Sequence, residues 1–113
     1  MTKRTTNARQ LGEFERAVML AVMSLEKRAY GVAIRDELEQ RLERDVSFGA
    51  VYTTLDRLEA KGFVSSSHGE PTPERGGRAK KFFVVEPPGL EALKQSRRTV
   101  DAIWAMSPIR GLK

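Results

Sequence analysis

The hydrophobic positions of the chain change their period twice, and the changes divide it into helices, a hairpin and a last helix. Between residues 11 and 25 apolar residues recur every three or four positions, which predicts a helix. Its apolar stripe consists of Leu11, Phe14, Val18, Ala21, Val22 and Leu25. Met19, Leu20 and Met23 lie on the other side, so this helix is apolar on two sides and must bury both. Residues 1–10 are polar and aperiodic, which is typical of a loose arm.

Two shorter helices are predicted next. Residues 30–42 have an inward stripe of Ile34, Leu38 and Leu42. In the following helix Ser47 is a plausible N-cap, and Gly62 stands where a left-handed residue would end it. Its inward stripe is Val51, Leu55 and Leu58. The opposite face carries only small, hydroxyl and charged side chains, namely Gly49, Ala50, Thr53, Asp56, Arg57 and Ala60, with Tyr52 at the edge.

After residue 62 the period changes to that of strands. Residues 63–67 and 80–86 predict two strands of a hairpin, and the segment between them is rich in glycine and proline. Pro87, Pro88 and Gly89 then break the second strand and open a last helix. The apolar positions of this helix, with one arginine among them, follow a 3,4,3,4 spacing like a short coiled-coil seam. They are Leu90, Leu93, Arg97, Val100 and Trp104.

The order of these elements predicts a mainly α fold with a β-hairpin wing, which is a winged helix-turn-helix followed by one further helix. At 113 residues the chain is long enough for a single core. We expect a flexible basic arm at 1–10, the winged domain at 11–86, and a C-terminal helix and tail at 87–113. The core of the winged domain is expected to form without the last helix.

The net charge of +5 is unevenly distributed. The arm carries Lys3, Arg4 and Arg9 without an acidic residue, and a second basic group lies along the hairpin. Segregated basic charge favours an anionic partner, of which nucleic acid is the commonest. A merely solubilising surface remains the alternative.

Together the polar third helix and the basic hairpin predict binding to double-stranded DNA. The third helix would enter the major groove, and the hairpin would lie near phosphates. The candidate DNA-binding residues are Ser47, Gly49, Tyr52, Thr53, Arg57, Arg75, Arg78, Lys80 and Lys81. Tyr52 could equally be a packing residue, and Asp56 could hold Arg57 in place. The hairpin cations could also protect a strand edge from aggregation.

Other classes of function find little support. With no cysteine and one histidine, His68, we expect no enzyme, no metal site and no cofactor. The chain has no apolar run of membrane-spanning length and no secretion signal, so we expect a cytoplasmic protein without a membrane partner. A winged-helix module that binds protein is an alternative, but it would require an apolar third-helix face or an acidic wing.

Three stretches, YGVAIRDELEQRL, VSFGAVYTTLDRLEAKGFV and GGRAKKFFVVEPPG, resemble the PadR-like transcriptional regulators. The most specific features are Gly31 after Tyr30, the G-x-x-Y pattern from Gly49, and the R-L-E-x-x-G pattern ending at Gly62. The family often has proline where this chain has Phe48. MarR-like and penicillinase-repressor-like regulators share the ending of the third helix and remain alternatives.

The resemblance implies a homodimeric repressor that binds a palindromic operator. In such proteins the last helix packs against the first helix of the partner. The implied dimer interface comprises Met19, Leu20, Met23, Leu90, Leu93, Arg97, Val100 and Trp104. Some members bind planar aromatic compounds between subunits, so the same surface is a candidate site for a small aromatic effector.

Overall fold

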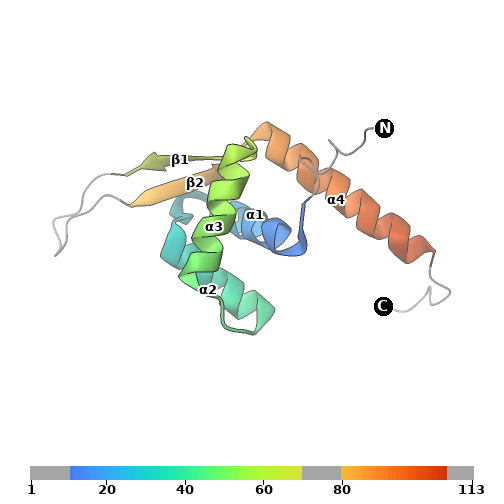
Figure 1. The fold of residues 1–113 in the computed structure, drawn as a ribbon, viewed down its shortest axis with the longest axis horizontal. Coiled ribbons are helices and arrows are strands. Elements are labelled where there is room, and N and C mark those ends of the chain that lie inside the picture. The colour runs from blue at the N-terminus through green and yellow to red at the C-terminus, as the bar shows by residue number, and fades with distance from the viewer. Residues whose placement is uncertain (1–10, 70–79, 107–113) are drawn as a thin grey trace.

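The computed structural model describes residues 11–69 and 80–106. In chain order its elements are α1 (Glu13–Leu25), a 3-10 turn (Glu26–Arg28), α2 (Gly31–Leu42), α3 (Phe48–Ala60), β1 (Val64–His68), β2 (Lys81–Val85) and α4 (Pro87–Ala105). Helices α1 to α3 form the body, and the hairpin and α4 extend to opposite sides of it (Figure 1). The predicted fold class is confirmed. The predicted arm, Arg75, Arg78 and the tail lie outside the described residues.

Helix α3 begins and ends as the sequence predicts. The Ser47 hydroxyl accepts a hydrogen bond of 3.0 Å from the N–H of Ala50, which caps the helix start. At the other end Gly62 has a φ of +79°, a left-handed conformation that favours glycine. The N–H of Phe63 then donates to the carbonyl of Leu58 at 2.9 Å, as in a Schellman motif. The chain therefore reverses sharply from α3 into the hairpin.

The core lies between α1, α2, α3 and the base of the hairpin. Its fully buried side chains include Val18, Met19, Ile34, Val51, Leu55 and Leu58. The predicted inward stripe of α3 is therefore confirmed. The inward prediction for Leu42 is wrong, because this residue is 37% exposed. Helix α2 ends there, and Glu43 adopts a left-handed φ of 55° that turns the chain away from the core.

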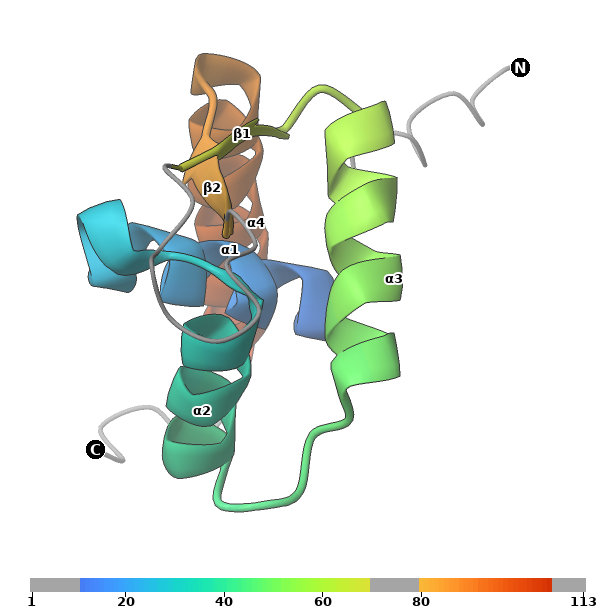
Figure 2. The ribbon, with the colours of Figure 1, turned by 90° about the vertical axis from the view of Figure 1, so that its left-hand side faces the viewer.

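The hairpin is an antiparallel pair that is fastened to the start of α2. Val64 pairs with Val85 at its base. The N–H of Phe83 donates to the carbonyl of Ala29 at 2.8 Å, and Tyr30 forms a bridge with Phe82. The two strands fall within one residue of the predicted ranges. The hairpin is therefore hydrogen-bonded to the segment that leads into α2. Figure 2 views the molecule from the hairpin side, with the strands in front of α1 and α4.

Helix α4 is docked to the turn after α3 through its first residues. The N–H of Glu86 donates to the carbonyl of Phe63 at 2.8 Å. A Cβ atom added at Gly89 would lie 2.3 Å from that carbonyl oxygen and 2.9 Å from the Met19 methyl group. Only glycine permits this close approach. Farther along, the Arg16 guanidinium donates to the hydroxyl of Ser96 at 2.7 Å.

Two residues predicted for the dimer interface are instead part of the core of one chain. Met19 is fully buried, and Leu93 is only 7% exposed. The reason is that the first turns of α4 cover α1, so the second apolar side of α1 is partly buried within the same chain. The expectation of a core independent of the last helix is therefore wrong. A chain ending at Glu86 would lose Leu93 from its core.

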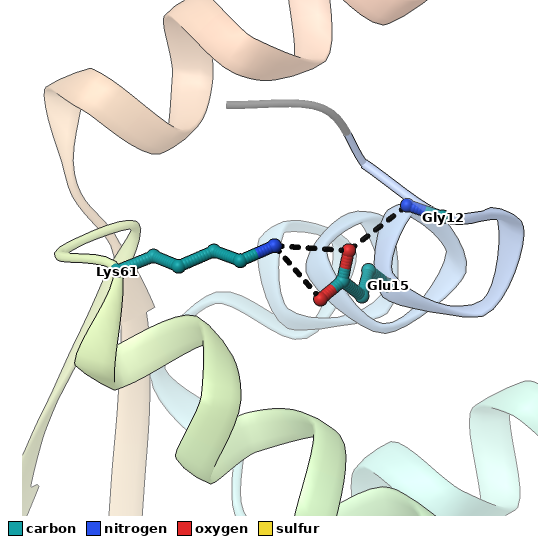
Figure 3. A network of polar contacts seen from close by, with 3 residues as sticks. All are labelled: Gly12, Glu15 and Lys61. Atoms are coloured by element: carbon teal, nitrogen blue, oxygen red, sulfur yellow. Dashed lines mark hydrogen bonds and ion pairs between the residues drawn. The ribbon is translucent and has the colours of Figure 1, made fainter. Parts of the chain in front are cut away.

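A partly buried ion pair ties the beginning of α1 to the end of α3 (Figure 3). The Lys61 ammonium lies 3.1 Å and 3.3 Å from the two carboxylate oxygens of Glu15. The same carboxylate accepts a hydrogen bond of 2.9 Å from the N–H of Gly12, at the N-cap of α1. The carboxylate is thus held by charge and by a hydrogen bond, which compensates for its burial.

We predict that Gly89→Ala destabilises the protein, because its methyl group would overlap the backbone carbonyl of Phe63. Overpacking of this kind costs about 1–3 kcal/mol. Urea unfolding followed by circular dichroism measures the loss. Gly49→Ala is the matched control, because its methyl group would meet only the Ser47 hydroxyl, at 4.0 Å. Equal stability of the two variants would contradict the close packing of α4.

Candidate nucleic-acid interface

Helix α3 has one face in the core and one face in solvent. Thr54 is buried beside the inward stripe, at 4% exposure. The outer positions predicted for DNA are all exposed, and they comprise Ser47, Gly49, Tyr52, Thr53 and Arg57. Phe48, Ala50 and Asp56 are exposed among them. Nothing in residues 11–69 and 80–106 covers this surface. Apart from two aromatic rings, its side chains are small or polar.

Gly49 has no structural reason to be glycine. Its φ is not in the left-handed region, and a Cβ atom there would make one contact of 4.0 Å, which is ordinary van der Waals distance. Glycine in a helix is nevertheless less favourable than alanine. An empty Cβ position on an exposed helix face leaves room for another molecule to approach the backbone.

Tyr52 is anchored on α2. A Cβ atom at Gly31 would lie 1.9 Å from the tyrosine hydroxyl oxygen, so the ring tip occupies the space that a side chain would fill. Tyr52 was predicted either to contact DNA or to pack against the protein, and the structure shows that it packs against Gly31. The ring is still 42% exposed, and a phosphate contact stays a prediction.

Arg57 and Asp56 are both exposed, and within the described part of the chain no hydrogen bond or ion pair joins them. The interpretation that Asp56 holds Arg57 in place is therefore not supported by a contact. Both side chains extend from the outer face of α3. The Arg57 guanidinium is available to an anionic or base-edge partner.

The hairpin contributes two described cations. The Lys80 ammonium lies 4.3 Å from the ring centroid of Tyr30, which is a cation–π contact between the residue before β2 and the start of α2. Lys81 is exposed at the start of β2. Phe82 packs edge-on against Tyr30, with ring centroids 5.6 Å apart. Positive charge is thus placed on a rigid aromatic base.

An aromatic stack at the start of α3 was missed by the sequence reasoning. The Arg35 guanidinium carbon lies 4.2 Å from the ring centroid of Phe48. The Phe48 ring is inclined by 24° to that of Tyr52, with centroids 6.3 Å apart. An aromatic residue at the first position of a helix with a polar outer face was the available signal. The part played by Arg35 depends on the crossing of α2 and α3, which no local pattern specifies.

Most of the residues predicted for the interface line one groove between α1 and α4, including Leu93, which is otherwise buried in the core. The volume of the groove is about 590 Å³, and its walls also include Leu20, Met23, Leu90, Arg97 and Val100. Arg16, Lys94 and Arg98 add positive charge. Trp104 is not among the lining residues and is 61% exposed farther along α4.

A metal-binding site and a membrane-spanning segment are two further possibilities for the described residues. His68 is exposed, and residues 11–69 and 80–106 contain no group of three or more His, Cys, Asp or Glu side chains placed to hold a metal ion. Within the same ranges no helix combines the length and apolarity needed to cross a membrane.

Comparison with known proteins places these features in context. Residues 19–95 match the transcriptional regulator PadR-like family. The transcriptional regulator Rv3488 of Mycobacterium tuberculosis is 33% identical over 94 residues, which is 80% of this chain and 83% of that protein. A PadR-like transcription factor from Bacteroides fragilis has a similar fold, with a TM-score of 0.72, 19% identity, and coverage of 91% and 92% of the two chains. For a PadR family regulator from Eggerthella lenta the TM-score is 0.63, at 24% identity and 82% and 80% coverage.

We predict that Gly49→Ala separates folding from DNA binding. The variant should unfold at the same or a higher urea concentration, because alanine is favoured over glycine in a helix. Its affinity for DNA should fall about tenfold or more, because a methyl group would occupy the approach to the α3 backbone. Fluorescence anisotropy with labelled DNA measures the second effect. Unchanged affinity would show that DNA does not approach Gly49.

Proposed function

The chain belongs to the PadR-like family of transcriptional regulators, and we propose that it is a homodimeric repressor that binds a palindromic operator. Proteins of this family are DNA-binding regulators of transcription and not enzymes. Membership also favours the PadR-like interpretation over the MarR-like and penicillinase-repressor-like alternatives. As a regulator of genes the protein would act in the cytoplasm.

The single observation that carries the proposal is the uncovered outer face of α3. Its inward residues Val51, Leu55 and Leu58 are completely buried, so the helix is held rigidly by the body. Its outer face is exposed and bears Thr53 and Arg57, which can hydrogen-bond to base edges and phosphates. A rigid helix with a small, polar outer face fits the major groove.

The charge of the wing supports the same partner. Lys80 and Lys81 lie at the start of β2, and the whole chain has a net charge of +5. Phosphate contacts from such residues position a protein on DNA without reading its sequence. We therefore assign reading to α3 and positioning to the hairpin.

The outer half of α4 supports a second copy of the chain as partner. Only Gly89, Ala92 and Leu93 of this helix are buried. Ile103 and Trp104 are 56% and 61% exposed, and helical segments without tertiary packing are marginal in water. A partner helix along the seam would cover the apolar residues of α4 together with Leu20 and Met23 of α1.

The groove between α1 and α4 supports release by a small aromatic effector. It has apolar walls with methionine and leucine side chains, which adapt to flat ligands. The effector would bind where the two chains meet. Binding there would change the separation of the two α3 helices and so weaken contact with the operator.

Selection of bound sequences from random DNA tests the proposal as a whole. We expect enrichment of a palindrome whose half-sites are about one helical turn apart, some 34–36 Å. Enrichment of a single unrepeated site would contradict the dimeric mode of binding. Absence of enrichment would contradict sequence-specific DNA binding and favour a winged module that binds protein.

We predict that Trp104→Asp converts the dimer into a monomer, because it places a charge in the seam while leaving the buried residues of α4 intact. Operator affinity should then fall by about 10²-fold or more, because two linked half-sites no longer bind together. Light scattering and fluorescence anisotropy measure the two effects. Ala102→Asp is the matched control, because this exposed position lies about 200° around the helix from Trp104. Dimerisation of both variants would place the interface elsewhere.

We predict a steep loss of operator affinity with salt, with a slope of log affinity against log salt of about −0.9 per neutralised phosphate. Lys81→Ala should make the slope shallower by about 1 for each phosphate that the lysine neutralises. Lys27→Ala removes the same charge from the 3-10 turn between α1 and α2, which contributes none of the proposed DNA-binding residues, and should leave the slope unchanged. Gel-shift titrations across a salt series give the slopes. An identical change in both variants would mean that net charge alone is responsible.

A further inference from the structure

We propose that Phe48 reads the 5-methyl group of a thymine in each operator half-site, with Arg35 and Tyr52 positioning its ring. This inference rests on the DNA-binding function proposed above. It concerns an aromatic residue at the point where a recognition helix first meets the bases. It also assigns a role to the aromatic stack at the start of α3.

The position of Phe48 is that of a base-reading residue. It is the first residue of α3, directly after the N-cap Ser47. Residues at the N-terminal end of a recognition helix contact base edges in the major groove. Phe48 is 39% exposed, and nothing in the described ranges covers the rest of its ring. The fold therefore leaves a large apolar side chain in water where DNA is expected.

The ring is held in place from α2. Tyr52 rests on Gly31, where it fills the space of the missing side chain, and its ring lies nearly parallel to that of Phe48. The guanidinium of Arg35 lies 4.2 Å from the Phe48 ring centroid. Two side chains that both depend on α2 thus restrict the ring before any ligand binds. Preorganisation of this kind reduces the entropy lost on binding.

Hydrogen bonding accounts for only part of the placement of the Arg35 guanidinium, whose Nη2 atom pairs with the Asp36 carboxylate at 3.2 Å. Its Nε atom is buried and has no hydrogen-bond partner within the described part of the chain. An unsatisfied buried donor is unfavourable. The planar group therefore lies against the Phe48 ring as a stacking contact, without a hydrogen bond from Nε.

The chemistry of the major groove selects the ligand. A phenylalanine ring can neither donate nor accept a conventional hydrogen bond. Guanine, cytosine and adenine present polar groups in this groove, whereas thymine adds an apolar methyl group. Placing the ring against polar base edges or a phosphate would remove water from them without replacing its hydrogen bonds. The thymine methyl group is therefore the matching contact.

The test compares thymine with deoxyuridine, which lacks only the methyl group. Once an operator has been selected with the full-length protein, each thymine is replaced in turn and affinity is measured by fluorescence anisotropy. We expect one position in each half-site at which wild-type affinity falls about fourfold, the effect of one buried methyl group. Phe48→Ala should bind both versions of that position equally.

Two variants separate reading from folding. Phe48→Pro also removes the ring but suits the first position of a helix, so it should lose methyl sensitivity while α3 remains folded. Arg35→Lys keeps the charge but loses the planar group, so it should reduce methyl sensitivity without changing the salt slope. Circular dichroism confirms that each variant is folded.

The outcomes distinguish this inference from the proposed function. Failure of the wild-type protein to enrich any DNA sequence would overturn the proposed function. An enriched operator with no methyl-sensitive thymine would overturn only the role of Phe48. The same holds if Phe48→Ala and Phe48→Pro, both folded, keep the wild-type ratio of thymine to deoxyuridine affinity.

Discussion

The reversal of the chain at Lys61, Gly62 and Phe63 is the constraint on which the rest of the structure depends. Gly62 takes the left-handed conformation that stops α3 and starts the hairpin. Lys61 pairs with Glu15 and so fixes α3 against α1. The carbonyl of Phe63 accepts a hydrogen bond from the first turn leading into α4. Helix α3, the hairpin and α4 are therefore joined within three residues.

This junction separates two kinds of surface. On one side α3 and β2 carry a polar and basic face whose residues are held by a well-packed body. On the other side α4 leaves that body and exposes apolar side chains, including Trp104 at 61%. Charged groups favour a hydrated anionic partner, and exposed apolar groups favour a complementary protein surface. The two proposed partners, DNA and a second copy of the chain, would therefore bind to different surfaces.

Local patterns in the sequence predicted the elements well because they depend on short-range physics. The Ser47 cap, the Gly62 stop and the inward stripe of α3 all follow from spacing and backbone preference. The errors arose where distant segments meet. Met19 and Leu93 are buried because the first turns of α4 cover α1. Leu42 is exposed because it is the last residue of α2, where the chain turns away from the core. The Arg35 stack likewise requires the crossing of two helices, which periodicity cannot give.

The close approach of Gly89 to the Phe63 carbonyl places the start of α4 at the end of α3, so any tilt of α4 would have its pivot at this contact. A helix of 19 residues is about 28 Å long at 1.5 Å per residue. A tilt of about 10° at the pivot would move its far end by about 5 Å, which exceeds the 3.4 Å between neighbouring base pairs. In the proposed dimer, the packing at Gly89 would therefore affect which half-site spacing the two α3 helices can span.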